Sequence, residues 1–67
     1  MHAIVVNGST FQIEAGSTLA DLLQQLELDK TMVAIEQNAE IVPKTEFSVR
    51  VLEDGDRVEI VHFVGGG

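Results

Sequence analysis

The sequence contains no cysteine, no tryptophan and no tyrosine, and it has one proline in 67 residues. Without cysteine the chain can form no disulfide, thiolate zinc site, cysteine-ligated iron–sulfur cluster or thiol nucleophile. A short domain that lacks such staples depends on one well-packed apolar core. The content of hydrophobic residues, 45%, is sufficient for that core, and the length predicts a single domain.

Basic residues are also scarce, with four Lys and Arg against eleven Asp and Glu, so that the net charge is −7. Such a surface repels phosphate backbones and attracts basic protein surfaces, so no nucleic-acid partner is expected. No apolar run approaches the ~18 residues of a membrane span. The first residues also lack the basic region of a signal peptide. We therefore expect a cytoplasmic protein with no membrane partner.

Motifs for catalysis and metal binding are missing as well. No glycine-rich phosphate loop precedes a lysine, and no nucleophile has an evident base. His2 and His62 are the two histidines, too few for a metal site without a third ligand. The acidic segment 53–56 lacks the ligand spacing of a calcium loop. The sequence therefore predicts no bound cofactor and no bound metal. It indicates a carrier protein or co-substrate of partner enzymes rather than an enzyme.

The first half of the chain reads as a hairpin followed by a helix. Residues 3–6 and 10–14 have strand patterns, and Asn7 and Gly8 between them suit a tight turn. Thr18 is the predicted N-cap, with Asp21 as its capping-box partner. The next apolar residues recur at helical spacing and form one core-facing stripe: Leu19, Leu22, Leu23 and Leu26.

The second half reads as short strands and one long strand. Segments 32–36 and 40–42 are predicted strands, joined by a turn at 37–39 and ended by Pro43. An irregular turn held by Phe47 follows, segment 49–52 is ambiguous, and an acidic turn at 53–56 leads into a strand over 57–64. This order predicts an α+β domain, a β-grasp roll with a mixed four- to five-stranded sheet on one main helix, or else another small α+β sandwich.

The final strand has two different faces. Val58 and Ile60 share one face, and the alternating polar residues mark the other face as exposed. Continuing the alternation places Val61 and Phe63 on the exposed face, with Val5 of the first strand as a further candidate. We expect these residues to dock a partner, because an apolar cluster on an acidic surface is typical of an interface. The alternative is that loops of the chain cover Val61 and Phe63.

The last residues, Gly65 to Gly67, form a predicted flexible tail after a domain over 1–64. A glycine tail can thread a narrow channel, and Gly67 offers an unhindered carboxylate. Attack of that carboxylate on the α-phosphate of ATP gives an acyl-adenylate, from which a sulfur nucleophile can displace AMP to form a thiocarboxylate. The alternatives are a frayed terminus and a remnant of cloning.

Several short segments, taken in order, resemble a known family. They are Val6-Asn7-Gly8, Ala15-Gly16-Ser17-Thr18-Leu19-Ala20-Asp21-Leu22-Leu23, Val33-Ala34-Ile35-Glu36, Ile41-Val42-Pro43-Lys44, Asp54-Gly55-Asp56-Arg57-Val58-Glu59-Ile60-Val61 and Val64-Gly65-Gly66-Gly67. Their order and spacing over the whole chain resemble the ThiS family, the ubiquitin-like sulfur carriers of thiamine biosynthesis. Lys44 and Phe47 depart from that pattern, where arginine and tryptophan are common.

The resemblance implies a set of partners. A ThiF-like enzyme would adenylate the tail at Gly66 and Gly67, using ATP and magnesium. A persulfide relay would supply sulfur from cysteine, and a ThiG-like thiazole synthase would receive it. Gly65 is a further candidate for docking the partners. Two alternatives share the fold: the small subunit of molybdopterin synthase, which has the same tail chemistry, and a β-grasp interaction domain or protein modifier whose tail is never thiolated.

Overall fold

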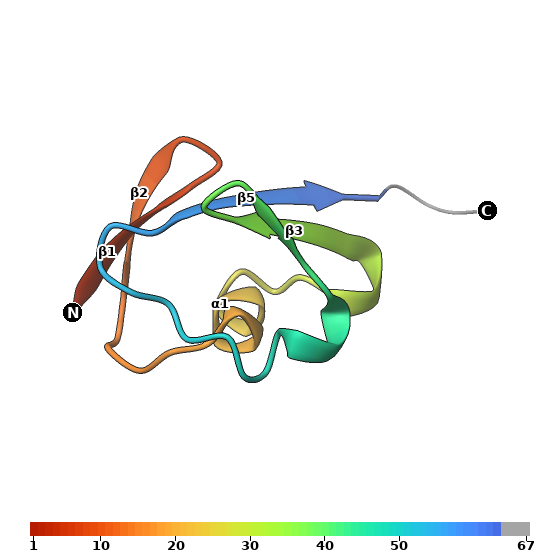
Figure 1. Cartoon of the computed structure of the whole chain (residues 1–67), viewed down its shortest axis with the longest axis horizontal. Helices are drawn as coiled ribbons and strands as arrows, with labels where there is room; N and C mark the ends of the chain where they lie inside the picture. The colour runs from red at the N-terminus through yellow and green to blue at the C-terminus, as the bar shows by residue number, and fades with distance from the viewer. Residues whose placement is uncertain (64–67) are drawn as a thin grey trace.

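The computed structural model describes residues 1–63, which form one sheet and one main helix (Figure 1). The strands are β1 (His2–Val6), β2 (Ser9–Ile13), β3 (Val33–Gln37), β4 (Glu40–Val42) and β5 (Arg57–His62), and the helix is α1 (Leu19–Gln25). Two single-turn 3-10 helices complete the chain, η1 (Lys30–Met32) and η2 (Lys44–Glu46). The sheet has the order β2-β1-β5-β3-β4. This mixed five-stranded sheet with one helix confirms the predicted α+β, β-grasp architecture.

The hairpin of β1 and β2 forms where the sequence predicts it. Five antiparallel residue pairs run from His2 opposite Ile13 to Val6 opposite Ser9. Asn7 and Gly8 make the turn with φ angles of 49° and 86°, the two left-handed conformations that a two-residue hairpin turn requires. Local turn chemistry therefore sets the register of this edge of the sheet.

Strand β5 lies at the centre of the sheet. It pairs in parallel with β1, where Val5 lies opposite Arg57, and antiparallel with β3, where Ile35 lies opposite Ile60. The Asn7 side chain continues the pairing beyond the end of β1, because Oδ1 accepts from the Ile60 amide at 2.7 Å and Nδ2 donates to its carbonyl at 3.1 Å. The turn residue of the first hairpin thus also braces the last strand.

Helix α1 is capped as predicted. It ends one residue before Leu26, the last of the four predicted core-facing leucines. The Thr18 hydroxyl accepts from the Asp21 amide at 3.2 Å, and the Asp21 carboxylate accepts from the Thr18 amide at 2.9 Å. The helix ends at Gln25, since Leu26 is its C-cap and Glu27 has a φ of 58°. Leu26 is therefore half-buried at the end of the helix.

One apolar core fills the space between the sheet and α1. Its buried members are Ile4, Ile13, Leu19, Leu22, Leu23, Val33, Ile35, Val42, Phe47, Leu52, Val58 and Ile60. Phe47 holds the turn after η2 as predicted, because its ring is buried and its carbonyl accepts from the Ala20 amide at 2.9 Å. None of the helices in the described residues is long and apolar enough to cross a membrane.

Several boundaries differ from the sequence prediction. β1 and β2 each begin one residue earlier than predicted, β3 begins at Val33 rather than at residue 32, and β5 ends at His62. Gln37 belongs to β3 rather than to the following turn, which consists of Asn38 and Ala39 with φ angles of 51° and 71°. The ambiguous segment 49–52 is a loop whose residue Val51 makes an isolated bridge with Thr18. The inclusion of Gln37 in β3 depends on its pairing with Val58, and the bridge at Val51 depends on Thr18. Both partners lie far away in the sequence, so the local pattern could not predict either feature.

Candidate functional site

The predicted tail residues Gly65, Gly66 and Gly67 lie outside the described residues, as does Val64. The part of the site that the structure describes is the segment leading to them, formed by β5 and Phe63. The candidate site can therefore be built from the face that this segment presents.

Strand β5 alternates as the sequence predicts. Val58 and Ile60 are buried, whereas Arg57 and Glu59 are exposed on the opposite face. Val61 continues that exposed face with 58% of its surface accessible, and Phe63 has 48% accessible. The loops of residues 1–63 therefore leave both apolar side chains accessible to a partner.

Phe63 is held in place although it lies beyond the end of β5. Its amide donates to the Met32 carbonyl at 2.7 Å. The Lys44 ammonium lies 5.9 Å from the centre of the Phe63 ring, within the range of a cation–π contact, and donates to the Val33 carbonyl at 2.8 Å. Lys44 thus links η2 to β3 and to the last described residue.

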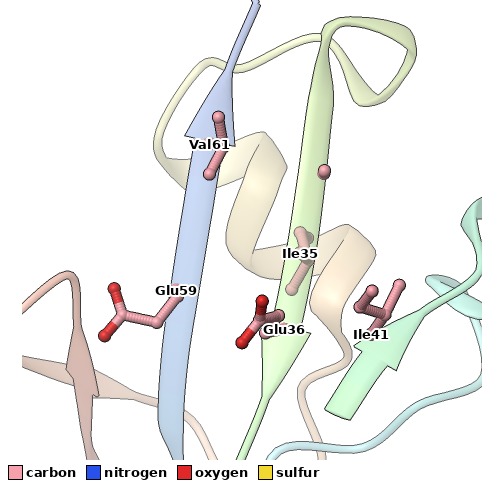
Figure 2. Close-up of a pocket in the computed structure, with 6 residues that line it drawn as sticks. Ile35, Glu36, Ile41, Glu59 and Val61 are labelled. Carbon is pink, nitrogen blue, oxygen red and sulfur yellow. The ribbon is translucent and has the colours of Figure 1, made fainter. Parts of the chain in front are cut away.

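The exposed face of β3, β4 and β5 carries a shallow apolar hollow. Its lining residues are Ala34, Ile35, Glu36, Ile41, Glu59 and Val61, drawn in Figure 2 on three adjacent strands with α1 behind the sheet. The hollow encloses about 110 Å³, well below the few hundred Å³ of a typical cofactor pocket. Its size suits a protruding side chain of a partner.

Val5 does not join this hollow, contrary to the predicted cluster. It shares the exposed face, but it lies opposite Arg57, four residues before Val61 along β5. At about 3.3 Å per residue the separation is about 13 Å. Ile41 of β4 lines the hollow instead, with 76% of its surface exposed. Ile41 was not predicted from the sequence, because a three-residue strand gives no readable alternation.

Asp56 organises the turn that starts β5. Its carboxylate accepts hydrogen bonds from Nε2 of Gln37 at 2.8 Å, Nδ2 of Asn38 at 3.0 Å and the Glu53 amide at 2.8 Å. Burial acts to raise the pKa of Asp56, but these hydrogen bonds outweigh it and hold the pKa below its usual value. The ionised carboxylate therefore ties β3 to the beginning of β5.

We expect the Asp56 interactions to make stability depend on pH. Because the pKa in the folded state lies below that in the unfolded state, the stabilisation is complete above about pH 5 and is lost as the pH falls through the folded value. Asp56→Asn should lower the free energy of unfolding at pH 7 by about 1–3 kcal/mol, since a buried charged acceptor is lost.

Urea titrations of both proteins at several pH values between neutral and acid would measure this effect. The difference in stability between wild type and Asp56→Asn should shrink as the pH falls below about 4. A difference that stays constant with pH would show that ionisation of Asp56 contributes nothing to the fold.

Within residues 1–63 no three His, Asp or Glu side chains are grouped closely enough to hold a metal ion. His2 lies on β1, where its Nδ1 is 3.4 Å from the Leu52 carbonyl oxygen. His62 lies at the far end of β5, opposite Val33. The two histidines are thus at different ends of the sheet.

Comparisons with known proteins point to one family. The model of the ThiS family matches residues 4–67. A thiazole synthase of Paramagnetospirillum magneticum is 44% identical over 64 residues, which are 96% of this chain and 20% of that protein. The sulfur carrier protein ThiS of Bacillus subtilis is 46% identical over 50 residues, 75% of this chain and 76% of that one.

A solved structure shares the whole fold. The crystal structure of the thiamine biosynthesis protein ThiS from Geobacter metallireducens superposes with a TM-score of 0.81 at 29% identity, over 97% of this chain and 99% of that one. The chain spans about a fifth of the length of the thiazole synthases it matches. The similarity to those enzymes therefore concerns one domain of a larger protein.

Proposed function

The chain belongs to the ThiS family, and on that basis we propose that it is a sulfur carrier of thiamine biosynthesis that works through the carboxylate of Gly67. A carboxylate oxygen attacks the α-phosphorus of ATP, and pyrophosphate leaves. The terminal sulfur of a persulfide then attacks the acyl carbon, and AMP leaves. A thiol reduces the resulting S–S bond, so that a thiocarboxylate remains on Gly67.

The observation that carries this proposal is the family match, which extends over the domain and through the glycines to residue 67. The described residues add a sheet face with exposed apolar side chains beside the segment that leads to Gly66 and Gly67. The domain supplies recognition in this proposal. The partner enzymes supply the chemistry, with ATP and magnesium bound by the adenylating enzyme.

Three partners follow from the proposal. A ThiF-like enzyme adenylates the tail, and a persulfide donor supplies the sulfur. A ThiG-like thiazole synthase receives it, which is supported by the 44% identity between this chain and part of a thiazole synthase. Each partner must reach Gly67, which follows β5 by five residues in the sequence.

Intact mass spectrometry tests the proposed function. The full chain with a free carboxylate at Gly67 is incubated with a ThiF-like enzyme, ATP, magnesium and a persulfide donor. We expect one oxygen of the terminal glycine to be replaced by sulfur, located by fragmentation of the C-terminal peptide. An unmodified terminal peptide, under conditions in which a ThiS of known activity reacts, would show that the chain is not a sulfur carrier.

We also propose that Phe63 and Val61 form the docking surface for the adenylating enzyme, with Gly65, which follows them in the sequence, as a further contact. Phe63→Ser should weaken binding at least tenfold, about 1.4 kcal/mol, because burial of one large apolar side chain contributes about 1.5–3 kcal/mol. The fold should survive, since Phe63 is exposed and outside the core. Titration calorimetry gives the affinity, and circular dichroism reports the fold.

Val49→Ser is the matched control for this substitution. Val49 is also an exposed apolar residue, but its loop packs on the helix side of the sheet, where the Leu19 amide donates to the Arg50 carbonyl at 3.0 Å. We expect Val49→Ser to bind like wild type. Equal affinities for wild type and Phe63→Ser would exclude Phe63 from the docking surface.

A further inference from the structure

Two glutamates occupy paired positions on adjacent strands at the centre of the exposed sheet face. Glu36 of β3 lies directly opposite Glu59 of β5, and both side chains are exposed. Residues opposite each other in an antiparallel pair have Cβ atoms about 4.5–5.5 Å apart, and like charges in that position destabilise a sheet. The fold therefore pairs two acidic residues where residues of opposite charge would stabilise the sheet more. In Figure 2 the Glu59 carboxylate points away from Glu36, and rotation about its side-chain bonds would bring the two carboxylates to one ligand.

Neither carboxylate has a cationic partner among residues 1–63. The ion pair in this part of the chain joins Arg50 to Glu46 at 2.8 Å, away from the exposed sheet face. The two glutamates belong to the lining of the apolar hollow (Figure 2). Ile41 lies opposite Glu36, and Val61 follows Glu59 by two positions on the same face. Arg57 shares this face two positions before Glu59 but forms no ion pair with either carboxylate. The face thus offers two carboxylates without an ion-pair partner among residues 1–63, beside apolar side chains.

We propose that Glu36 and Glu59 together bind one arginine of the adenylating enzyme, an inference that rests on the function proposed above. A guanidinium is planar and presents several donors in a fixed fork, so it can bind two neighbouring carboxylates at once. Its methylene stem can lie on apolar surface, here that of Val61 and Ile41. The volume of the hollow, about 110 Å³, admits one such side chain. The net charge of −7 also favours a basic partner.

The test compares two double variants of the full chain that have the same net charge. Glu36→Gln with Glu59→Gln removes the paired carboxylates, whereas Glu14→Gln with Glu53→Gln removes two exposed carboxylates from other segments. Binding to the ThiF-like enzyme is measured by titration calorimetry at several salt concentrations. We expect the first variant to bind at least about tenfold more weakly, with less salt dependence, and the second to stay within about twofold of wild type.

Melting temperatures show whether weaker binding reflects a lost arginine contact, a damaged fold or a cation site. Because a like-charge pair is removed, Glu36→Gln with Glu59→Gln should unfold at a temperature no lower than wild type, so weaker binding cannot reflect a damaged fold. Equal affinities for the two double variants would overturn the proposal. Magnesium or calcium ions that raise the melting temperature of wild type but not of this variant would also overturn it, since the pair would then be a cation site.

Measuring thiolation by intact mass alongside binding distinguishes the two proposals. Wild type that becomes thiolated, together with an unaffected Glu36→Gln and Glu59→Gln variant, leaves the sulfur-carrier function in place and excludes the arginine contact. Wild type that neither binds the enzyme nor becomes thiolated removes the proposed function and this inference with it.

Discussion

A chain lacking Gly66 and Gly67 is expected to lose sulfur transfer completely and to unfold at the same temperature as wild type. The proposed reaction needs an unhindered carboxylate at the end of a thin tail. Truncation leaves a carboxylate that is two residues shorter in reach and does not enter the adenylating site. The described core lies between Ile4 and Ile60, so removal of residues 66 and 67 should leave it intact.

Thiocarboxylate formation and the melting temperature, measured on the same preparation, check both parts of this expectation. Binding to the adenylating enzyme is the informative control, because the sheet face with Phe63 and Val61 is retained. We expect the truncated chain to bind and to inhibit the thiolation of wild type. A large fall in melting temperature would mean that the glycines pack against the domain, contrary to the predicted separation of tail and fold.

Leu23→Ala is expected to cause the largest loss of stability, about 2–5 kcal/mol. Leu23 lies on α1 with 2% of its surface exposed, and its truncation leaves a cavity between the helix and the sheet. A small domain has about 5–15 kcal/mol of stability in total. The substitution should therefore shift the urea midpoint strongly and could leave part of the protein unfolded at room temperature.

Gln24→Ala is the matched control for this substitution, since Gln24 is adjacent on the same helix but exposed. It should change stability little, because alanine favours the helix and no core contact is lost. Similar midpoints for Leu23→Ala and wild type would contradict the burial of this helix face.

The local elements of the fold could be predicted because their signals lie close together in the sequence. Asn7 and Gly8 tolerate the positive φ angles that the hairpin turn requires. Thr18 and Asp21 cap α1 within one helical turn. The alternation along β5 likewise depends on neighbouring residues and correctly exposes Val61. In each case the information and the structure that it determines span only a few residues.

The arrangement of the site could be predicted only in part, because it depends on pairing between distant segments. Glu36 and Glu59 are 23 positions apart, and no local pattern shows that they lie opposite each other. Strand alternation assigns Val5 to the correct face of the sheet. It does not predict the position of Val5 along β5, because the parallel register with Arg57 depends on pairing between distant segments. The contact between Lys44 and Phe63 also depends on this long-range packing.

The central position of β5 has a consequence for the synthesis of the protein. β1 with β2 and β3 with β4 are two hairpins, which the sheet joins through β5, the last described strand to leave the ribosome. Isolated hairpins are marginally stable, and pairing between the ends of the chain slows folding. The nascent chain should therefore remain open until Arg57–His62 emerges. The strand that completes the sheet also precedes the glycines in the sequence. The docking face should therefore form only when synthesis of the tail is nearly finished.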